Sequence, residues 1–315
     1  MDSRSGVMTI LREAMSIPKR NKKLMIPVML LTFIPSSFLL MGNYVSIIPL
    51  LLNFIIKLYL LSSNHASNPE FYDILVGLKK DAEALLHVDM VFTISLYIIS
   101  VFSMILIIHA TSMVHSGKQL TIRDLLSMIK RRWKGPLVTR VYFTILYIGY
   151  TVLSVSFISI LMLNATGSIG MYVFGGFIAL VARLLYAYLA MVWTMGLVIS
   201  VLDDSCCGLE AMGRAGELIR GKRLQGFFIA FILLCVDTVL IGGYSLIVSK
   251  IHPQLEVQKA SAMLMLNVSV LLKIFSQMVY TVFYHDCKRS QGKLDEELRS
   301  MIYTRVPSSP IVDEV

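Results

Sequence analysis

The chain has 315 residues, of which 56% are hydrophobic and only 16% are charged, and its formal net charge is +9. Soluble domains carry about 25% charged residues, so this composition excludes an ordinary soluble protein. The apolar residues gather in runs that approach or exceed the roughly 18 residues of a membrane span, whereas a soluble helix is apolar along one stripe only. The sequence therefore predicts an all-α, polytopic integral membrane helical bundle. Its basic residues lie beside apolar spans and indicate contact with anionic lipid headgroups rather than nucleic acid.

The N-terminal segment, residues 1–23, is polar with a weak amphipathic pattern, which predicts a short helix on the membrane surface before Pro18. The first apolar run follows a basic stretch and has no small-residue cleavage site, so we expect an uncleaved signal anchor. This run extends from 24 to 61, too long for one simple crossing and short for two. We interpret it as a span at 24–46 with an interfacial or lumen-side extension, where Lys57 would snorkel to the surface.

The remaining apolar runs predict five more spans, near residues 89–112, 141–163, 171–201, 227–249 and 260–284. The polar stretches at 62–88 and 113–140 are predicted loops, and 164–170 is a predicted tight turn. The tail is charged and ends in a proline- and serine-containing sequence, which indicates disorder. The predicted organisation is an N-terminal cytosolic segment, a six-span transmembrane domain and a largely disordered cytosolic tail: 1–23, 24–284 and 285–315.

Lysine and arginine are distributed unequally between the two sides of the predicted spans. The segments on the side of the N-terminus contain 22 of these residues, and the segments on the opposite side contain 4. Short cytosolic segments of membrane proteins are enriched in basic residues. We therefore expect six spans, with both termini in the cytosol.

Two stretches on the predicted cytosolic side are amphipathic, and we expect them to form short helices at the membrane interface, with partner binding as an alternative. Residues 208–220 have on their apolar side Leu209, Met212, Leu218 and Ile219. Residues 121–133 have Ile122, Leu125, Leu126, Met128, Ile129 and Trp133. The basic residues beside the second stretch are the candidate contacts for anionic lipid, although orientation in the membrane would also explain them: Lys130, Arg131, Arg132 and Lys134.

Three charged residues lie within predicted spans: Arg183, Asp237 and Lys273. Each costs roughly 2.5–3.5 kcal/mol at the centre of a bilayer, so we expect them to face inward and to pair. The last two spans are adjacent and antiparallel, which would allow Asp237 and Lys273 to meet at one depth, with Arg183 as a third member. Such a cluster is either a structural ion pair that fixes helix register or a polar path for a substrate or proton.

Other motifs indicate no catalytic, metal or cofactor site. The stretch from Gly216 to Arg223 approaches a phosphate-binding loop, but Arg223 stands where magnesium binding requires Ser or Thr, and the context is helical. His109 and His115 are not spaced for one helix face, so a metal site is not expected. The adjacent Cys206 and Cys207 are either acylated or unmodified interfacial residues.

Four stretches carry a family resemblance: Ile10–Ala14, Trp133–Thr139, Val201–Arg223 and Phe283–Lys288 with Tyr303 and Pro307 beyond it. Together they resemble a plant family of six-helix transmembrane proteins of unknown function. The third stretch resembles, more loosely, the membrane domain attached to some bacterial glycerophosphodiester phosphodiesterases. It departs from that pattern at Asp203, Asp204 and Gly216, where related sequences have Glu and Ser. The phosphodiesterase catalytic domain is absent, so the resemblance implies no hydrolase activity.

Two classes of function follow from these patterns. The first is a non-enzymatic membrane protein that organises lipid or protein partners in the endoplasmic reticulum or another endomembrane, with the plasma membrane as an alternative location. The second is a transporter or lipid-handling protein with a polar site at Arg183, Asp237 and Lys273. Paired short or broken spans, which mark many transporter sites, are absent from the sequence, so we favour the first class.

Overall fold

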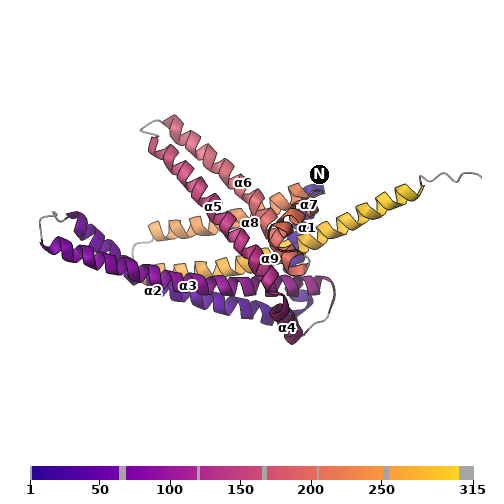
Figure 1. The fold of residues 1–315 in the computed structure, drawn as a ribbon, viewed down its shortest axis with the longest axis horizontal. Helices are drawn as coiled ribbons and strands as arrows, with labels where there is room; N and C mark the ends of the chain where they lie inside the picture. Colours follow the sequence, from indigo (N-terminus) through magenta and orange to yellow (C-terminus); the bar gives the residue numbers. More distant parts are fainter. Residues whose placement is uncertain are drawn as a thin grey trace, which may run out of the picture. The chain divides into compact units, whose positions relative to one another are not determined.

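The computed structural model describes residues 2–63, 69–118, 121–164, 169–203, 206–250 and 255–304 (Figure 1). Within these ranges the chain forms nine helices and no strand. Their bounds are α1 (Asp2–Arg20), α2 (Lys22–Ser63), α3 (Pro69–His115), α4 (Ile122–Arg132), α5 (Lys134–Asn164), α6 (Ile169–Leu202), α7 (Leu209–Leu218), α8 (Arg223–Lys250) and α9 (Leu255–Thr304).

Six of the described helices, α2, α3, α5, α6, α8 and α9, are long and apolar enough to cross a membrane. The all-α class and the number of span-length helices predicted from the sequence are therefore confirmed. The helices divide into two compact units. The first comprises Met1–Ser16, Lys134–Ile232 and Val279–Val315, and the second comprises Ile17–Trp133 and Leu233–Met278.

In the second unit, α2 and α3 lie along each other as an antiparallel hairpin (Figure 1). Lys57 and Asp81 form an ion pair of 2.7 Å between the two helices. A Cβ atom on Gly42 would lie 3.2 Å from the ring of Phe92, which shows close packing further along the hairpin.

This hairpin corrects two expectations. Most of 62–88, predicted as a loop, is helical from Pro69 onward. Lys57 does not extend away from the helix toward the membrane surface but contacts Asp81. A single helix is marginal without tertiary packing, so the pairing with α2 explains why this charged stretch is helical.

The helix α4, also in the second unit, packs on α3. Leu125 and Ile129, which the sequence places on a face at the membrane interface, are buried against the protein, one turn apart. The N-terminus of α4 is stabilised by Asp124, whose carboxylate accepts the backbone N–H of Thr121 at 3.2 Å. The helix therefore has one protein-facing side and one exposed side.

In the first unit, α5 and α6 form another hairpin, and α7 packs on α6. The indole of Trp193 meets the ring of Phe143 edge to face, with the ring centres 5.5 Å apart. The hydroxyl of Tyr150 donates a hydrogen bond of 2.5 Å to the carbonyl of Ala182. These two contacts join α5 to α6 along the hairpin.

Both ends of the chain differ from the sequence expectations. The first helix continues through Pro18 to Arg20, and one of its faces is buried at Val7, Ile10, Ala14 and Ile17. It is therefore packed within the protein and is not only a surface helix. At the other end, α9 continues to Thr304, whereas the sequence predicts a disordered tail from residue 285. Residues 305–315 lie outside the described part of the chain.

Candidate functional site

The stretches that carry the family resemblance lie in the first unit, apart from Trp133. Contacts connect them across helices that are distant in sequence. The turn between α6 and α7 contacts the beginning of α5, the residues before α8 contact α9, and Gly6 of α1 lies against Gln225 of α8. We call the polar contacts made by the α6–α7 turn and by the residues before α8 the turn site.

The first part of the turn site is a hydrogen-bonded chain between the α6–α7 turn and α5. The backbone N–H of Gly208 donates to the hydroxyl of Thr139 at 2.8 Å, and this hydroxyl donates to the carbonyl of Gly135 at 3.1 Å. Thr139 is completely buried. Gly208 has a φ of 65°, a conformation that favours glycine, and it forms the N-cap of α7. This chain therefore sets where α7 begins.

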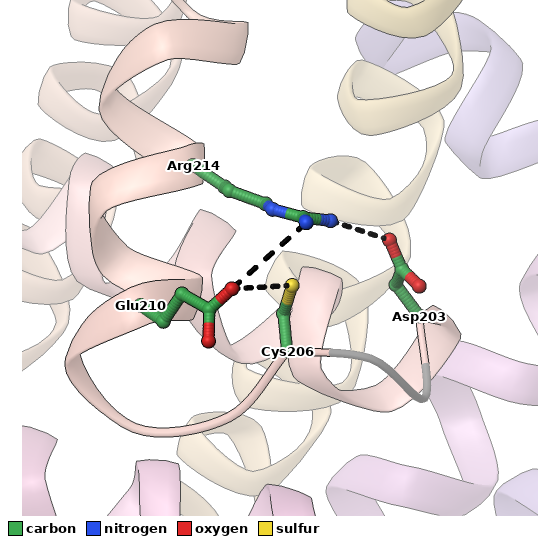
Figure 2. A network of polar contacts seen from close by, with 4 residues as sticks. All are labelled: Asp203, Cys206, Glu210 and Arg214. Carbon is green, nitrogen blue, oxygen red and sulfur yellow. Dashed lines mark hydrogen bonds and ion pairs between the residues drawn. The ribbon is translucent and has the colours of Figure 1, made fainter.

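The second part is the polar network shown in Figure 2. The guanidinium of Arg214 lies 3.3 Å from the carboxylate of Asp203 and 3.9 Å from that of Glu210. The thiol of Cys206 donates to Glu210 at 3.5 Å. The charged members are about half exposed, and exposed ion pairs contribute only about 0.2–1 kcal/mol each. The network therefore contributes little to the free energy of folding. Its contacts connect α7 to the end of α6 and to the turn between them.

The two cysteines of the turn occupy different environments. Cys206 is buried and is engaged with Glu210, whereas Cys207 is exposed. Of the two residues that the sequence offered for acylation, only Cys207 presents its thiol at the surface.

The third part is an ion pair between Lys222, in the turn before α8, and Asp286 of α9. The two side chains are 2.5 Å apart and about two-thirds buried. The stretch from Gly216 to Arg223 thus begins inside helix α7, and its Lys222 forms an ion pair with a carboxylate. A phosphate-binding loop requires a preceding strand, so this geometry is that of a helix connection.

The three charged residues that the sequence places within spans occupy different places. Arg183 is exposed on α6 in the first unit, with its guanidinium carbon 5.9 Å from the ring centre of Tyr186. Asp237 is half-buried on α8, and Lys273 is exposed on α9, both in the second unit. The ion pairs described above involve other residues. The pairing of Asp237 with Lys273 stays a prediction.

The candidate lipid contacts surround the junction of α4 and α5. Lys130 and Arg131 are exposed on α4, and Lys134 is exposed at the first position of α5. The side chain of Arg132 lies outside the described part of the structure. Trp133, between them, is 38% exposed.

Two residues of the turn site, Thr139 and Asp286, were not singled out as functional from the sequence. Thr139 resembles any threonine in the first turns of an apolar helix, and Asp286 resembles an ordinary interfacial carboxylate. Their partners are distant in sequence, so no local pattern reports the contacts. Among the described residues, no group of three His, Cys, Asp or Glu side chains is placed to hold a metal ion.

The buried hydrogen bond of Thr139 leads to a testable expectation. Thr139→Val keeps the shape of the side chain but leaves the buried N–H of Gly208 without an acceptor, which costs about 1–3 kcal/mol. The thermal midpoint in detergent should fall in Thr139→Val, whereas Thr139→Ser, which keeps the hydroxyl, should unfold near the midpoint of the unchanged protein. Thr144→Val is the matched control, because that hydroxyl only donates to a carbonyl of its own helix. Equal effects of the two valine substitutions would contradict the assigned role.

Comparison with known proteins identifies one family. A family model described as a domain of unknown function, DUF8558, matches residues 4–297. No curated protein and no solved structure matches the chain.

Proposed function

The chain belongs to the DUF8558 family, a family of unknown function, and from that premise we propose a non-enzymatic role in an endomembrane. The protein crosses the membrane six times, holds anionic lipid headgroups with its cytosolic side and thereby organises lipid or protein partners. We include in the proposal the cytosolic position of both termini, for which the unequal distribution of Lys and Arg is the support. We also include the plant origin and the loose relation to the phosphodiesterase membrane domain that the motifs resemble.

The observation that carries the proposal is the exposed side of α4. Leu125 and Ile129 point into the protein, while Leu126 and Trp133 are exposed together with Lys130 and Arg131. Exposed apolar and aromatic side chains beside basic groups are typical of a helix in the headgroup region, where the rings sit at the interface. Basic residues near an anionic surface contribute about 1 kcal/mol each. The exposed side of α4 is therefore suited to an anionic membrane surface.

The turn site supports a role in organisation rather than in chemistry. The cationic groups of Arg214 and Lys222 are engaged by carboxylates that belong to neighbouring helices or turns. Their charges hold the ends of α6, α7, α8 and α9 in place. In this proposal the turn site joins helix ends within the first unit, to which Lys134 of the candidate lipid contacts also belongs.

The test is retention of anionic lipid by the purified protein. We expect the variant with Lys130, Arg131, Arg132 and Lys134 all replaced by Gln to retain at least tenfold less phosphatidylserine and phosphoinositide, because four favourable charges of about 1 kcal/mol are lost. Lipids extracted from protein in nanodiscs and measured by mass spectrometry give the result.

The matched control replaces Lys79 and Lys80 with Gln. These two lysines are exposed on α3 and are predicted to lie on the opposite side of the membrane. The control should retain lipid as the unchanged protein does. An unaltered lipid composition in the fourfold variant would show that its basic residues only orient the protein, and the proposal would be wrong.

A further inference from the structure

Polar side chains connect α2 to the last two span-length helices inside the second unit. The side chains of Tyr44 on α2 and Tyr244 on α8 lie within hydrogen-bonding reach of each other. Two turns earlier on α2, the hydroxyl of Ser37 donates a hydrogen bond to the amide oxygen of Asn267 on α9. Both contacts belong to the second unit. They join segments that are distant in sequence and otherwise apolar.

The two contacts also show how α2 runs relative to α8 and α9. Only four residues separate α8 from α9, so these two helices are antiparallel neighbours. Tyr244 is six residues from the end of α8, whereas Asn267 is twelve residues from the start of α9. The step from Tyr44 back to Ser37 therefore moves the contact away from the α8–α9 connection by nearly the same length of helix. It follows that α2 is parallel to α8 and antiparallel to α9.

This register places Asp237 at the level of Ser37 and Asn267. Asp237 precedes Tyr244 by seven residues on α8, as Ser37 precedes Tyr44 by seven residues on α2. Two turns of a helix return to the same face about 10 Å along the axis. One level of the second unit thus receives a hydroxyl from α2, a carboxylate from α8 and an amide from α9.

Burial shows that Asp237 lies on the packed side of α8. Leu233, Asp237, Leu240 and Tyr244 follow one another at intervals of four, three and four residues, and all are buried or half-buried. Val239, on the other side of the helix, is 71% exposed. Asp237 is also near the middle of α8, a helix long and apolar enough to cross a membrane. Its carboxylate therefore belongs to the interior of the unit at the depth of the hydrocarbon.

A carboxylate in such a place requires a compensating positive charge. An ionised group in hydrocarbon is costly unless it is paired, and aspartates within spans often mark ion sites. Among the described residues, the ion pairs join side chains other than Asp237. The polar side chains at its level, Ser37 and Asn267, are neutral. Lys273 lies six residues beyond Asn267, about 9 Å along α9, and is exposed.

We propose that Asp237, Ser37 and Asn267 bind a small monovalent cation such as Na⁺ inside the second unit. Hard cations take oxygen ligands, and these side chains offer a carboxylate, a hydroxyl and an amide oxygen. The hydrogen bond between Ser37 and Asn267 holds two of the ligands together, and each oxygen keeps a lone pair for the ion. One carboxylate neutralises one positive charge, whereas a divalent ion would leave an excess charge in hydrocarbon.

Thermal unfolding of the purified full chain in detergent tests the inference. When NaCl replaces choline chloride at constant ionic strength, the midpoint of the unchanged protein should rise by about 4 °C or more, because an ion that binds only the folded state stabilises it. Asp237→Asn keeps the shape of the side chain but removes its charge, so it should lose this response. The matched control is Asp89→Asn, at an exposed position of α3 in the same unit, which should keep it.

Equilibrium dialysis with radioactive sodium is a second measurement that does not depend on unfolding. The unchanged protein and Asp89→Asn should each bind one ion per chain, and Asp237→Asn should bind none. The double variant Ser37→Ala and Asn267→Ala should bind about tenfold more weakly or less, since even the indirect partners of a bound ion typically contribute that much. The inference uses the membrane location in the proposed function, but not the proposed lipid contacts.

Three results would overturn the inference. They are a midpoint that does not respond to Na⁺, an equal response of Asp237→Asn and the unchanged protein, and a midpoint that follows pH but not Na⁺, which would show that Asp237 carries a proton. In the first case, coupling between Asp237→Asn and Lys273→Met would establish an ion pair of these residues instead. Retention of anionic lipid by Asp237→Asn should be unchanged, so failure here and failure of the proposed function are separate outcomes.

Discussion

Gly226→Leu is expected to destabilise the protein by about 3 kcal/mol, because α8 passes Met191 and Phe283 without room for a side chain. A Cβ atom at this position would lie within van der Waals overlap of the Met191 sulfur and 3.0 Å from the Phe283 ring. Both neighbours are completely buried, so they have little space into which to move. The site connects α6, α8 and α9 beside the turn site.

Thermal unfolding in detergent, followed by tryptophan fluorescence, measures this effect. The chain has two tryptophans, and Trp193 is buried in the first unit, so a Trp133→Phe background leaves one reporter of that unit. Gly213→Leu is the matched control, because no atom would lie within 4 Å of its Cβ and leucine favours helix over glycine by nearly 1 kcal/mol. A Gly226→Leu protein with an unchanged midpoint would show that this packing is not tight.

Gly208→Ala is expected to cost about 2–3 kcal/mol, and it acts on the turn site directly. The backbone of Gly208 has φ 65° and ψ −133°, a region that residues with a Cβ occupy only at a cost of about 1–3 kcal/mol. The new methyl group would also lie 3.3 Å from the ring of Tyr142. The N-cap of α7 and its bond to Thr139 should therefore be disturbed together.

The matched control is Gly117→Ala. Gly117 also has a positive φ, 69°, but no atom would lie within 4 Å of its Cβ. Its substitution should cost about 1 kcal/mol from backbone conformation alone. Adding Tyr142→Ala to Gly208→Ala should recover the part that comes from the ring contact. If Gly208→Ala and Gly117→Ala lower the thermal midpoint by the same amount, Tyr142 contributes nothing and backbone strain alone explains the loss.

The six span-length helices could be predicted from the sequence because crossing a bilayer depends on local composition. A run such as 171–201 is apolar on every side apart from Arg183, and its bounds lie within two residues of those of α6. The amphipathic character of α4 was predictable for a similar reason, since a helical period of apolar residues is visible without any partner. That Leu125 and Ile129 pack on the protein was not predicted, because the sequence placed this face at the membrane interface.

For α7 the sequence predicted an apolar side at the membrane interface, and the structure shows which residues of the helix pack on the protein. Leu209 was placed on the apolar side but is 61% exposed, while Ala211 and Ala215 are buried beside Met212. Small residues allow α7 to approach α6 so closely that a Cβ on Gly196 would lie 3.1 Å from Met212. Alanine carries a weak hydrophobic signal, so hydropathy alone selects the larger leucine.

The helical character of 69–88, the partner of Lys57 and the turn site were decided only by the tertiary structure. Asp81 lies across the hairpin from Lys57, Thr139 is distant from Gly208 along the chain, and Asp286 is distant from Lys222. Residue types and local periods determine which segments form apolar helices. Which polar side chains meet depends on how those helices pack, because a hydrogen bond or ion pair forms only when packing brings both groups within about 3 Å.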